Sequence, residues 1–284
     1  MRYGCWAEFV YISESSLTHK PDTYTFSQAA SLPMQALVAY GAVKAAGFCN
    51  KPVLDNIKHK DAVAEDIETV VDSENKALIT KEGTDLELVN KAKVAVVGAS
   101  STTGLMVVDM LVSRGVAVVG VSSASSAATV ISNGAVAVLD RNAGGLASKP
   151  PSLCLDVVID CVGGQAIEDA ARQALGNKGH FVTIMGPGSG AFGDGGDGAK
   201  EQMVQGMKIA SRSFKGMFSS MKYTQAAMPM TGGPKIIEQL MNEGLKTVVD
   251  SEVEMFDQDS MISAVEKVNN HKTRGRLVFI NDSN

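Results

Sequence analysis

The chain has 284 residues and a formal net charge of −5, and 45% of its residues are hydrophobic while only 5% are aromatic. This length allows one large domain or two unequal ones, and the apolar content is sufficient for a sizeable core. An acidic balance without a basic run argues against nucleic acid or an anionic membrane surface as the main partner.

The first predicted elements are a strand and a helical segment. Residues 4–12 alternate roughly between apolar and polar side chains, which predicts a strand. Helical signals follow over residues 25–46, with Ser27 as a capping residue and an interruption at Pro33.

Residues 50–91 differ in composition from the rest of the chain, with ten Asp or Glu against six Lys or Arg. We interpret them as an acidic insertion that makes a surface excursion, with a short hairpin around residues 70–80. Either a solvated insertion or a partner-binding loop is consistent with this composition.

From residue 93 onward, strands and helices alternate regularly. The expected strands are 93–97, 116–121, 136–139, 156–161 and 179–185, and the expected helices between them are 104–113, 126–133 and 165–174. This rhythm predicts an α/β fold with an open, doubly wound parallel Rossmann sheet and right-handed crossovers. A glycine-dense loop is expected at 186–198, then helices at 235–242 and 260–269 and strands at 246–249 and 276–280.

The turn Gly98–Gly104 carries the clearest chemical signal. It follows a buried strand and precedes a helix, the context in which backbone N–H groups bind a nucleotide pyrophosphate. In the G-x-G-x-x-G register that ends at Gly104, Ala99 and Ser101 occupy the first two glycine positions. Ser101 can offer its hydroxyl as a donor, and Gly104 permits close helix–strand packing. The alternative is a structural turn that no longer binds a nucleotide.

The end of the next strand indicates which cofactor the turn would take. Ser122 and Ser123 stand where NAD sites usually have an acidic residue for the adenosine ribose, and no acid follows until Asp140. An uncharged end accommodates a 2′-phosphate, so the sequence favours NADPH. Arg141 either supplies the positive charge for that phosphate or is an ordinary surface arginine.

Two further strands end at the same expected edge. Asp160 is either an acid of the site or a residue that orders the strand end. Cys161 is better explained as a small buried neighbour of the cofactor than as a nucleophile, because no histidine is placed beside it. The sequence identifies no catalytic residue.

Several other functions lack support in the sequence. Leu105 and Met106 stand where a P-loop needs Lys followed by Ser or Thr, and the YxxxK spacing of Tyr40 and Lys44 precedes the turn, so we interpret it as chance. The cysteines and histidines have no metal-ligand spacing, so no metal site is expected. No apolar run approaches the roughly 20 residues of a membrane-spanning helix.

Taken together, seven segments resemble the zinc-independent medium-chain dehydrogenase/reductase family of quinone oxidoreductase type, and most closely its reticulon-4-interacting-protein-like branch. The segments are GCWAEFV (4–10), AASLPMQALVAYGAV (29–43), VVGASSTTG (96–104), NGAVAVLD (133–140), LDVVIDCVGG (155–164), GHFVTIMG (179–186) and TRGRLVFI (273–280).

This resemblance implies a Rossmann domain over 31–249, and an incomplete GroES-like β domain formed by 1–30 and 250–284. It implies that NADPH binds in the cleft and that a quinone or an activated alkene or carbonyl is reduced by direct hydride transfer without metal. Three groups of residues would bind the cofactor. The backbone at Ser101, Thr102 and Thr103 would hold the pyrophosphate, with Gly104 as a further cofactor-binding residue of the turn. Ser122, Ser123 and Arg141 would face the adenosine phosphate, and the nicotinamide side would be lined by Cys161, Val162, Met185 and Gly186.

The resemblance also implies that most of the GroES-like barrel would precede the strand at 4–12, so the segments 250–256 and 276–280 are expected to lack partner strands. A catalytically silent binding or assembly subunit of an organellar complex is therefore the alternative to a reductase. The expected partners are a small apolar acceptor and a second copy of the chain or a larger complex. The expected location is mitochondrial or another organelle interior, with the cytoplasm as the alternative.

Overall fold

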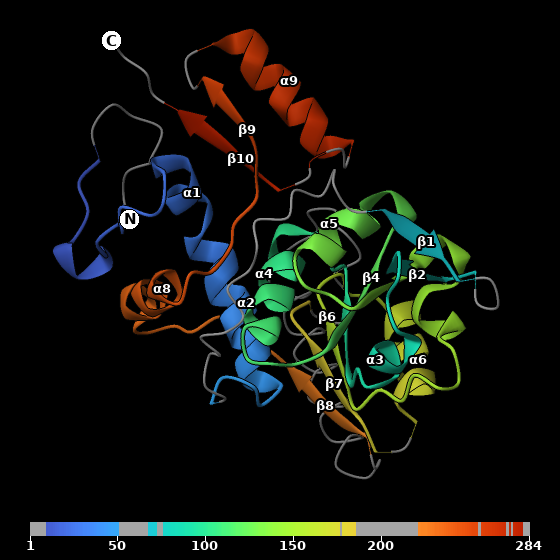
Figure 1. The fold of residues 1–284 in the computed structure, drawn as a ribbon. Coiled ribbons are helices and arrows are strands. Elements are labelled where there is room, and N and C mark those ends of the chain that lie inside the picture. The colour runs from blue at the N-terminus through green and yellow to red at the C-terminus, as the bar shows by residue number, and fades with distance from the viewer. Residues whose placement is uncertain are drawn as a thin grey trace. The chain divides into compact units, whose positions relative to one another are not determined.

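The structure is a computed structural model that describes residues 10–50, 68–72, 76–176, 178–185, 221–254, 257–270, 273 and 275–280. The chain divides into two compact units (Figure 1). The larger is Val38–Met228, and the smaller combines Met1–Leu37 with Pro229–Asn284. The boundary falls within helix α2 (Pro33–Ala45).

An eight-stranded sheet with the order β1-β2-β5-β4-β3-β6-β7-β8 forms the centre of the large unit. The strands are β1 (Thr69–Val71), β2 (Leu78–Lys81), β3 (Val94–Val97), β4 (Val118–Ser122), β5 (Ala137–Asp140), β6 (Val157–Asp160), β7 (His180–Thr183) and β8 (Lys222–Gln225). Six neighbouring strands of this sheet, β5-β4-β3-β6-β7-β8, are parallel to one another. When these six strands are numbered along the chain, their order across the sheet is 3-2-1-4-5-6. This is the Rossmann arrangement, so the predicted fold class is confirmed.

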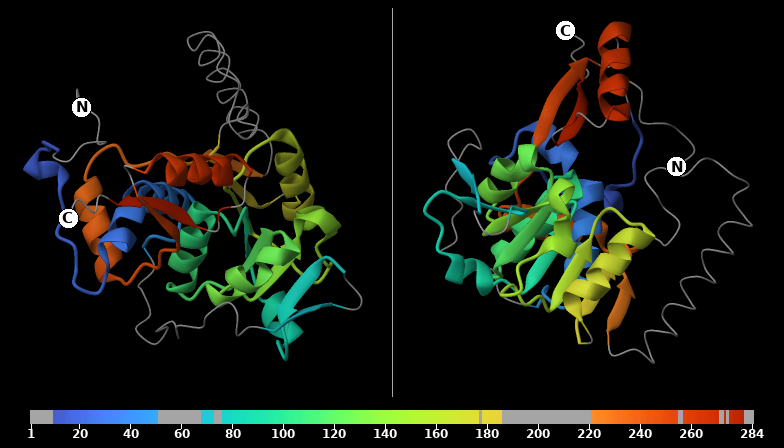
Figure 2. Two further views of the ribbon diagram at one scale, coloured as in Figure 1. Left: turned by 90° about the horizontal axis from the view of Figure 1, so that it is seen from above. Right: turned by 90° about the vertical axis from the view of Figure 1, so that its right-hand side faces the viewer.

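The central strands form because their sequences suit burial on both faces. Strands β3 (VAVV) and β6 (VVID) consist of residues that are all buried, and β-branched valine and isoleucine dominate them. Helices cover both faces (Figures 1 and 2): α4 (Thr102–Val112) and α5 (Ala127–Ser132) lie on one side, and α6 (Gln165–Leu175) on the other.

The predicted hairpin is present as the antiparallel pair β1 and β2. It is more than a surface excursion, because β2 also pairs antiparallel with β5 and extends the main sheet. Leu78 joins the hydrophobic core, whereas all three residues of β1 are exposed. Residues 51–67 of the predicted insertion lie outside the described residues.

The small unit contains a compact strand–helix–strand motif. Strand β9 (Val249–Glu254), helix α9 (Gln258–Asn269) and strand β10 (Arg276–Ile280) follow one another, and the two strands pair in parallel. The expectation that these two segments would lack partners is therefore wrong, because each is the partner of the other. The strand expected at 246–249 begins only at Val249.

Helices α1 (Phe26–Ser31) and α8 (Gly233–Asn242) complete the small unit. Thr25, not Ser27, caps α1: its side chain accepts a hydrogen bond from Gln28 N while the Gln28 side chain accepts one from Thr25 N. The hydroxyl of Tyr24 donates to the backbone oxygen of Leu245 at 2.8 Å, which ties this segment to the end of α8. The expected strand at 4–12 lies mostly outside the described residues, and Val10–Ile12 are not in a strand. Whether this unit is a GroES-like remnant stays a prediction.

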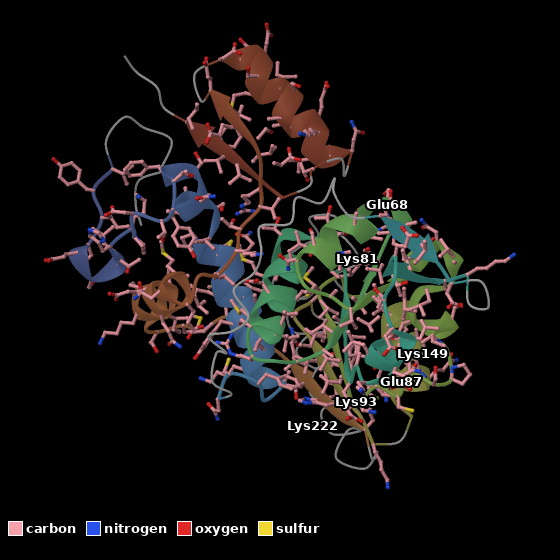
Figure 3. All side chains as sticks on the ribbon, viewed as in Figure 1. Glu68, Lys81, Glu87, Lys93, Lys149 and Lys222 are labelled. Atoms are coloured by element: carbon pink, nitrogen blue, oxygen red, sulfur yellow. The ribbon has the colours of Figure 1, made fainter. Side chains whose placement is uncertain are left out.

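One titratable group at the amino end of the sheet makes stability depend on pH. His180 begins β7, and its Nε2 lies 2.9 Å from the hydroxyl oxygen of Thr224. Figure 3 labels Lys93, which precedes β3, and Lys222, which begins β8, at this same end of the sheet. Burial, and after it the charge of Lys222, lower the pKa of His180 to about 4.

We expect His180→Gln to remove part of the acid sensitivity of the fold. In the unfolded chain histidine binds a proton near pH 6.5, but in the folded chain only near pH 4. The unfolded state therefore holds more protons between these values, and stability falls as the pH drops through that window. Melting temperatures from pH 7 to pH 4.5 should show a smaller decrease for the variant. An equal decrease in both proteins would contradict this assignment.

Candidate functional site

The turn between β3 and α4 is anchored to the neighbouring strand by its backbone. Gly98 has φ +74°, and the N–H groups of Gly98 and Ala99 both donate to Val121 O, at 3.0 and 3.2 Å. A side chain at Gly98 would be strained by the left-handed backbone, and its Cβ would lie 2.6 Å from Val162 Cγ2. The turn thus needs glycine at this position.

Ser101 caps helix α4. Its side-chain oxygen accepts a hydrogen bond from Gly104 N at 3.0 Å, and its hydroxyl donates to Gly98 O at 2.8 Å. The sequence shows that this hydroxyl can act as a donor, and in the structure it donates within the turn, to Gly98 O.

Two backbone donors of α4 have no partner. No oxygen of the described residues accepts a hydrogen bond from the N–H of Thr102 or Thr103, the first two residues of the helix. Such groups carry the partial positive charge of a helix N-terminus and favour an anion. Ser101 and Thr102–Thr103 therefore differ in role: the serine shapes the turn, and the threonine N–H groups are available to a ligand.

Gly104 brings the helix close to the strand. A Cβ at this position would lie 2.1 Å from Gly98 O and 2.9 Å from Ala99 Cα, both backbone atoms. Only glycine fits such an approach, in agreement with the packing role predicted for it.

The residues predicted to face an adenosine phosphate lie at the ends of the adjacent strands β4 and β5. Ser122 is buried and in register with Asp140, and Ser123 is the N-cap residue of the short helix η3 (Ala124–Ser126). Arg141 follows β5 and is exposed. The Asp140 carboxylate accepts a hydrogen bond from Asn142 N at 3.0 Å.

Beyond the turn, the structure places Cys161, Val162 and Met185 in the segments that follow β6 and β7. Val162 is 41% exposed, while Cys161 and Met185 are partly buried. Burial, and after it the Asp160 carboxylate, raise the pKa of the Cys161 thiol, so the thiol remains neutral and is a poor nucleophile. Gly186 lies outside the described residues.

Sheet register brings these segments to one edge. Val97 is paired with Asp160, and Asp160 with Thr183, so the strand ends of β3, β6 and β7 are aligned. The turn after β3 and the segment after β6 then flank the point where the strand order reverses, which is where doubly wound folds bind ligands. Thr183 was not among the predicted site residues; the signal available was a hydroxyl at the end of an otherwise apolar strand.

A parallel sheet in 3-2-1-4-5-6 order, with free N–H groups at its reversal point, defines a protein of the Rossmann class. Comparison with known protein families identifies the family within this class. The family model described as zinc-binding dehydrogenase matches residues 133–279. The chain belongs to this family.

Individual relatives agree with this assignment. The mouse protein named NAD(P)H oxidoreductase RTN4IP1, mitochondrial, is 27% identical over 286 residues, which are 98% of this chain and 61% of the relative. The chain thus spans less than two thirds of that relative's length.

Two solved structures have the same fold. Escherichia coli YhdH with bound NADPH gives a TM-score of 0.58 at 16% identity, covering 98% of this chain and 70% of that one. The quinone oxidoreductase from Coxiella burnetii gives 0.53 at 16% identity, covering 92% and 62%.

None of the described helices is long and apolar enough to cross a membrane. The same part of the chain contains no group of three or more His, Cys, Asp or Glu side chains arranged to hold a metal ion.

Proposed function

We propose that this chain binds NADPH and reduces a quinone, or an activated alkene or carbonyl compound, by direct hydride transfer without a metal. The observation that supports it is the pair of unpartnered N–H groups of Thr102 and Thr103 at the reversal point of the sheet. A pyrophosphate fits such a position, because it accepts hydrogen bonds and is attracted by the helix N-terminus. When bound, NADPH would supply the hydride.

The residues of the chain would divide the remaining work. Thr102 and Thr103 would hold the pyrophosphate, and the segments that contain Val162 and Met185 would line the nicotinamide side. Cys161, with its neutral thiol, would add to that lining without reacting. Positioning the acceptor against the nicotinamide and keeping water out are then the main contributions of the protein.

NADPH is proposed over NADH because of the strand ends at β4 and β5. Ser122 and Ser123 are uncharged, and Arg141 is exposed beside them at the end of the adjacent strand. An arginine can bind a 2′-phosphate through paired hydrogen bonds. We further propose a mitochondrial location and a homodimer or larger complex; the mouse relative's name includes the word mitochondrial.

The test is titration of the purified chain with NADPH and NADH, followed by thermal unfolding and a turnover assay with quinones and enones. At a ligand concentration one hundred times Kd, we expect stabilisation of about 2.7 kcal/mol. No shift with either nucleotide at millimolar concentration would contradict the proposal. Binding without turnover would instead favour the silent binding or assembly subunit.

Ser123→Asp should reverse the cofactor preference. The Ser123 side chain makes no capping hydrogen bond to η3, so its replacement removes no cap and the helix should remain. Its carboxylate would repel the 2′-phosphate and weaken NADPH binding about tenfold, while NADH could gain a ribose hydrogen bond. Fluorescence titration gives both values of Kd. Ser123→Asn is the neutral control and should retain the preference for NADPH; equal losses in both variants would contradict this role for Ser123.

A further inference from the structure

The last residues of β6 and β7 are joined side chain to side chain. Asp160 and Thr183 are paired in the sheet and are 1% and 2% exposed. The hydroxyl of Thr183 donates to Asp160 Oδ2 at 3.0 Å. This link lies where the two segments of the proposed nicotinamide side begin.

Each of the two side chains also holds the segment that follows its own strand. Asp160 Oδ1 accepts hydrogen bonds from Val162 N and Gly163 N, both at 2.9 Å. The hydroxyl oxygen of Thr183 accepts one from Met185 N at 3.2 Å and lies 2.8 Å from Met185 O. The Asp160–Thr183 pair therefore controls the backbone of both segments through four further contacts.

The position of Val162 follows from these bonds. Its side chain lies against Gly98, close enough that a Cβ there would be 2.6 Å from Val162 Cγ2. A shift of the 161–163 segment would thus move Val162, which belongs to the proposed nicotinamide side.

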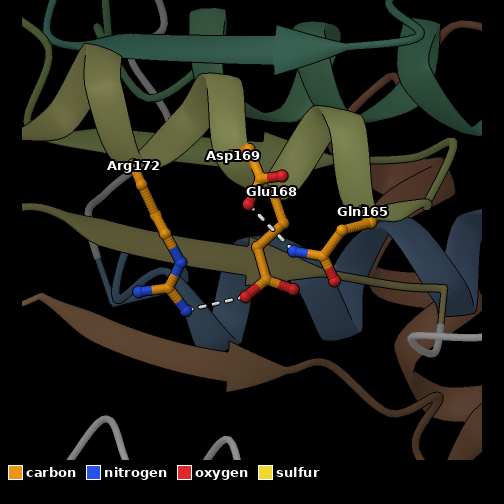
Figure 4. A network of polar contacts seen from close by, with 4 residues as sticks. All are labelled: Gln165, Glu168, Asp169 and Arg172. Atoms are coloured by element: carbon orange, nitrogen blue, oxygen red, sulfur yellow. Dashed lines mark hydrogen bonds and ion pairs between the residues drawn. The ribbon is translucent and has the colours of Figure 1, made fainter.

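Joining the two strands does not require a carboxylate. The backbone already links them here, because Ile184 N donates to Asp160 O at 3.0 Å. Burial raises the pKa of Asp160 despite its hydrogen bonds, and the nearby Glu168 on α6 adds to the rise, so the charged form is disfavoured at this position. Glu168 itself is paired with Arg172 at 2.7 Å, and Figure 4 shows both side chains on the same side of α6. The backbone pairing already joins β6 and β7. The Asp160 carboxylate and the Thr183 hydroxyl add the hydrogen bonds that hold the two segments after these strands.

We propose that Asp160 and Thr183 are positioning residues for the nicotinamide half of the cofactor, and this inference rests on the proposed function. By fixing the 161–163 and 184–185 segments, they set the geometry in which Val162 and Met185 meet the nicotinamide and its ribose. None of the side-chain hydrogen bonds described here for Asp160 and Thr183 reaches the N–H groups of Thr102 and Thr103 or the adenosine end of the site.

The test compares two probes that differ only at the nicotinamide. These are NADPH and 2′-phospho-ADP-ribose, measured by titration against the wild type, Thr183→Val and Thr183→Ser. Valine has the shape of threonine without the hydroxyl, and serine keeps the hydroxyl. We expect Thr183→Val to weaken NADPH binding about tenfold, a modest loss for a misplaced binding group, and 2′-phospho-ADP-ribose binding less than twofold. Thr183→Ser should restore wild-type affinity for both.

Asp160→Asn gives a second, independent measurement. Its Oδ1 can still accept from Val162 N and Gly163 N, and its amide can donate to Thr183, whose hydroxyl then turns to Met185 O. We expect NADPH binding within about threefold of the wild type, because the bond pattern is kept. If Thr183→Val does not fold, Thr183→Ala replaces it and is expected to show the same selective loss.

The outcomes separate the two levels of the proposal. Equal losses for both probes, or no loss for either, would overturn the positioning role while the wild type still binds NADPH and the proposed function stands. A wild type that binds neither NADPH nor NADH would overturn the proposed function and this inference with it.

Discussion

Gly104→Ala is expected to destabilise the large unit by about 3 kcal/mol, the upper end of the usual range for an overpacked site. The added Cβ would lie 2.1 Å from Gly98 O and 2.9 Å from Ala99 Cα. Because both are backbone atoms, no side-chain rotation can relieve the contact, and α4 must move away from the turn. Thermal unfolding should show a decrease of roughly 10 °C for a unit of this size.

The matched control is Gly233→Ala, another glycine at a helix. A Cβ there would meet only Leu37 Cδ1, at 3.4 Å, an ordinary contact. We expect its melting temperature to stay within about 2 °C of the wild type. If Gly104→Ala had the same melting temperature as the wild type, the turn would accommodate a Cβ without loss of stability. That result would contradict the packing role of Gly104.

Thr102→Pro is expected to weaken NADPH binding by about 10- to 100-fold while leaving the fold intact. Proline removes one N–H that the proposal assigns to the pyrophosphate, and a hydrogen bond to a charged group contributes about 1.5–3 kcal/mol. The fold tolerates proline because Thr102 is the first residue of α4, where the N–H has no helical partner. Ser101, with φ −71° and ψ 158°, already has the extended backbone that a residue before proline prefers.

Thr102→Ala separates the backbone from the side chain. It keeps the N–H and loses the hydroxyl, so its Kd for NADPH should stay within about threefold of the wild type. Titration of both variants with NADPH shows whether the backbone N–H or the side-chain hydroxyl of Thr102 binds the cofactor. Melting temperatures measured alongside show that both variants are folded. Wild-type affinity in a folded Thr102→Pro would mean that this N–H does not contact the cofactor.

The Rossmann sheet could be predicted because its central strands carry their own signal. Runs such as Val94–Val97 and Val157–Asp160 are apolar along their whole length, as burial on both faces requires. Strand β8 was missed because its sequence, Lys-Tyr-Thr-Gln, has no apolar run. It forms through pairing with β7, and none of its four residues is fully buried. Helix α3 (Leu86–Asn90) is too short to show a helical period.

Long-range pairing also explains why the expectation that segments 250–256 and 276–280 lack partner strands was wrong. Nothing near Asp250 or Arg276 in the sequence indicates that their segments pair with each other, since the partner is reached only across helix α9. The resemblance suggested partner strands from a GroES-like barrel, whereas the segments form a parallel pair with a crossover helix. Parallel strands need such a connection, and its pattern is weaker than that of a hairpin.

For the candidate site, the local chemistry of the turn was readable from residue types: Gly104 for close packing and an uncharged end at Ser122–Ser123. The residue types did not show which hydrogen-bond donors of the turn remain free for a ligand. The Ser101 hydroxyl could serve a ligand or the turn, and only the position of Gly98 O, three residues back in a folded turn, determines that it serves the turn. The link between Asp160 and Thr183 likewise depends on sheet register, which aligns residues 23 positions apart. Composition and short-range pattern therefore determine the elements and the kind of site, and hydrogen bonding between distant segments decides which atoms are left for a ligand.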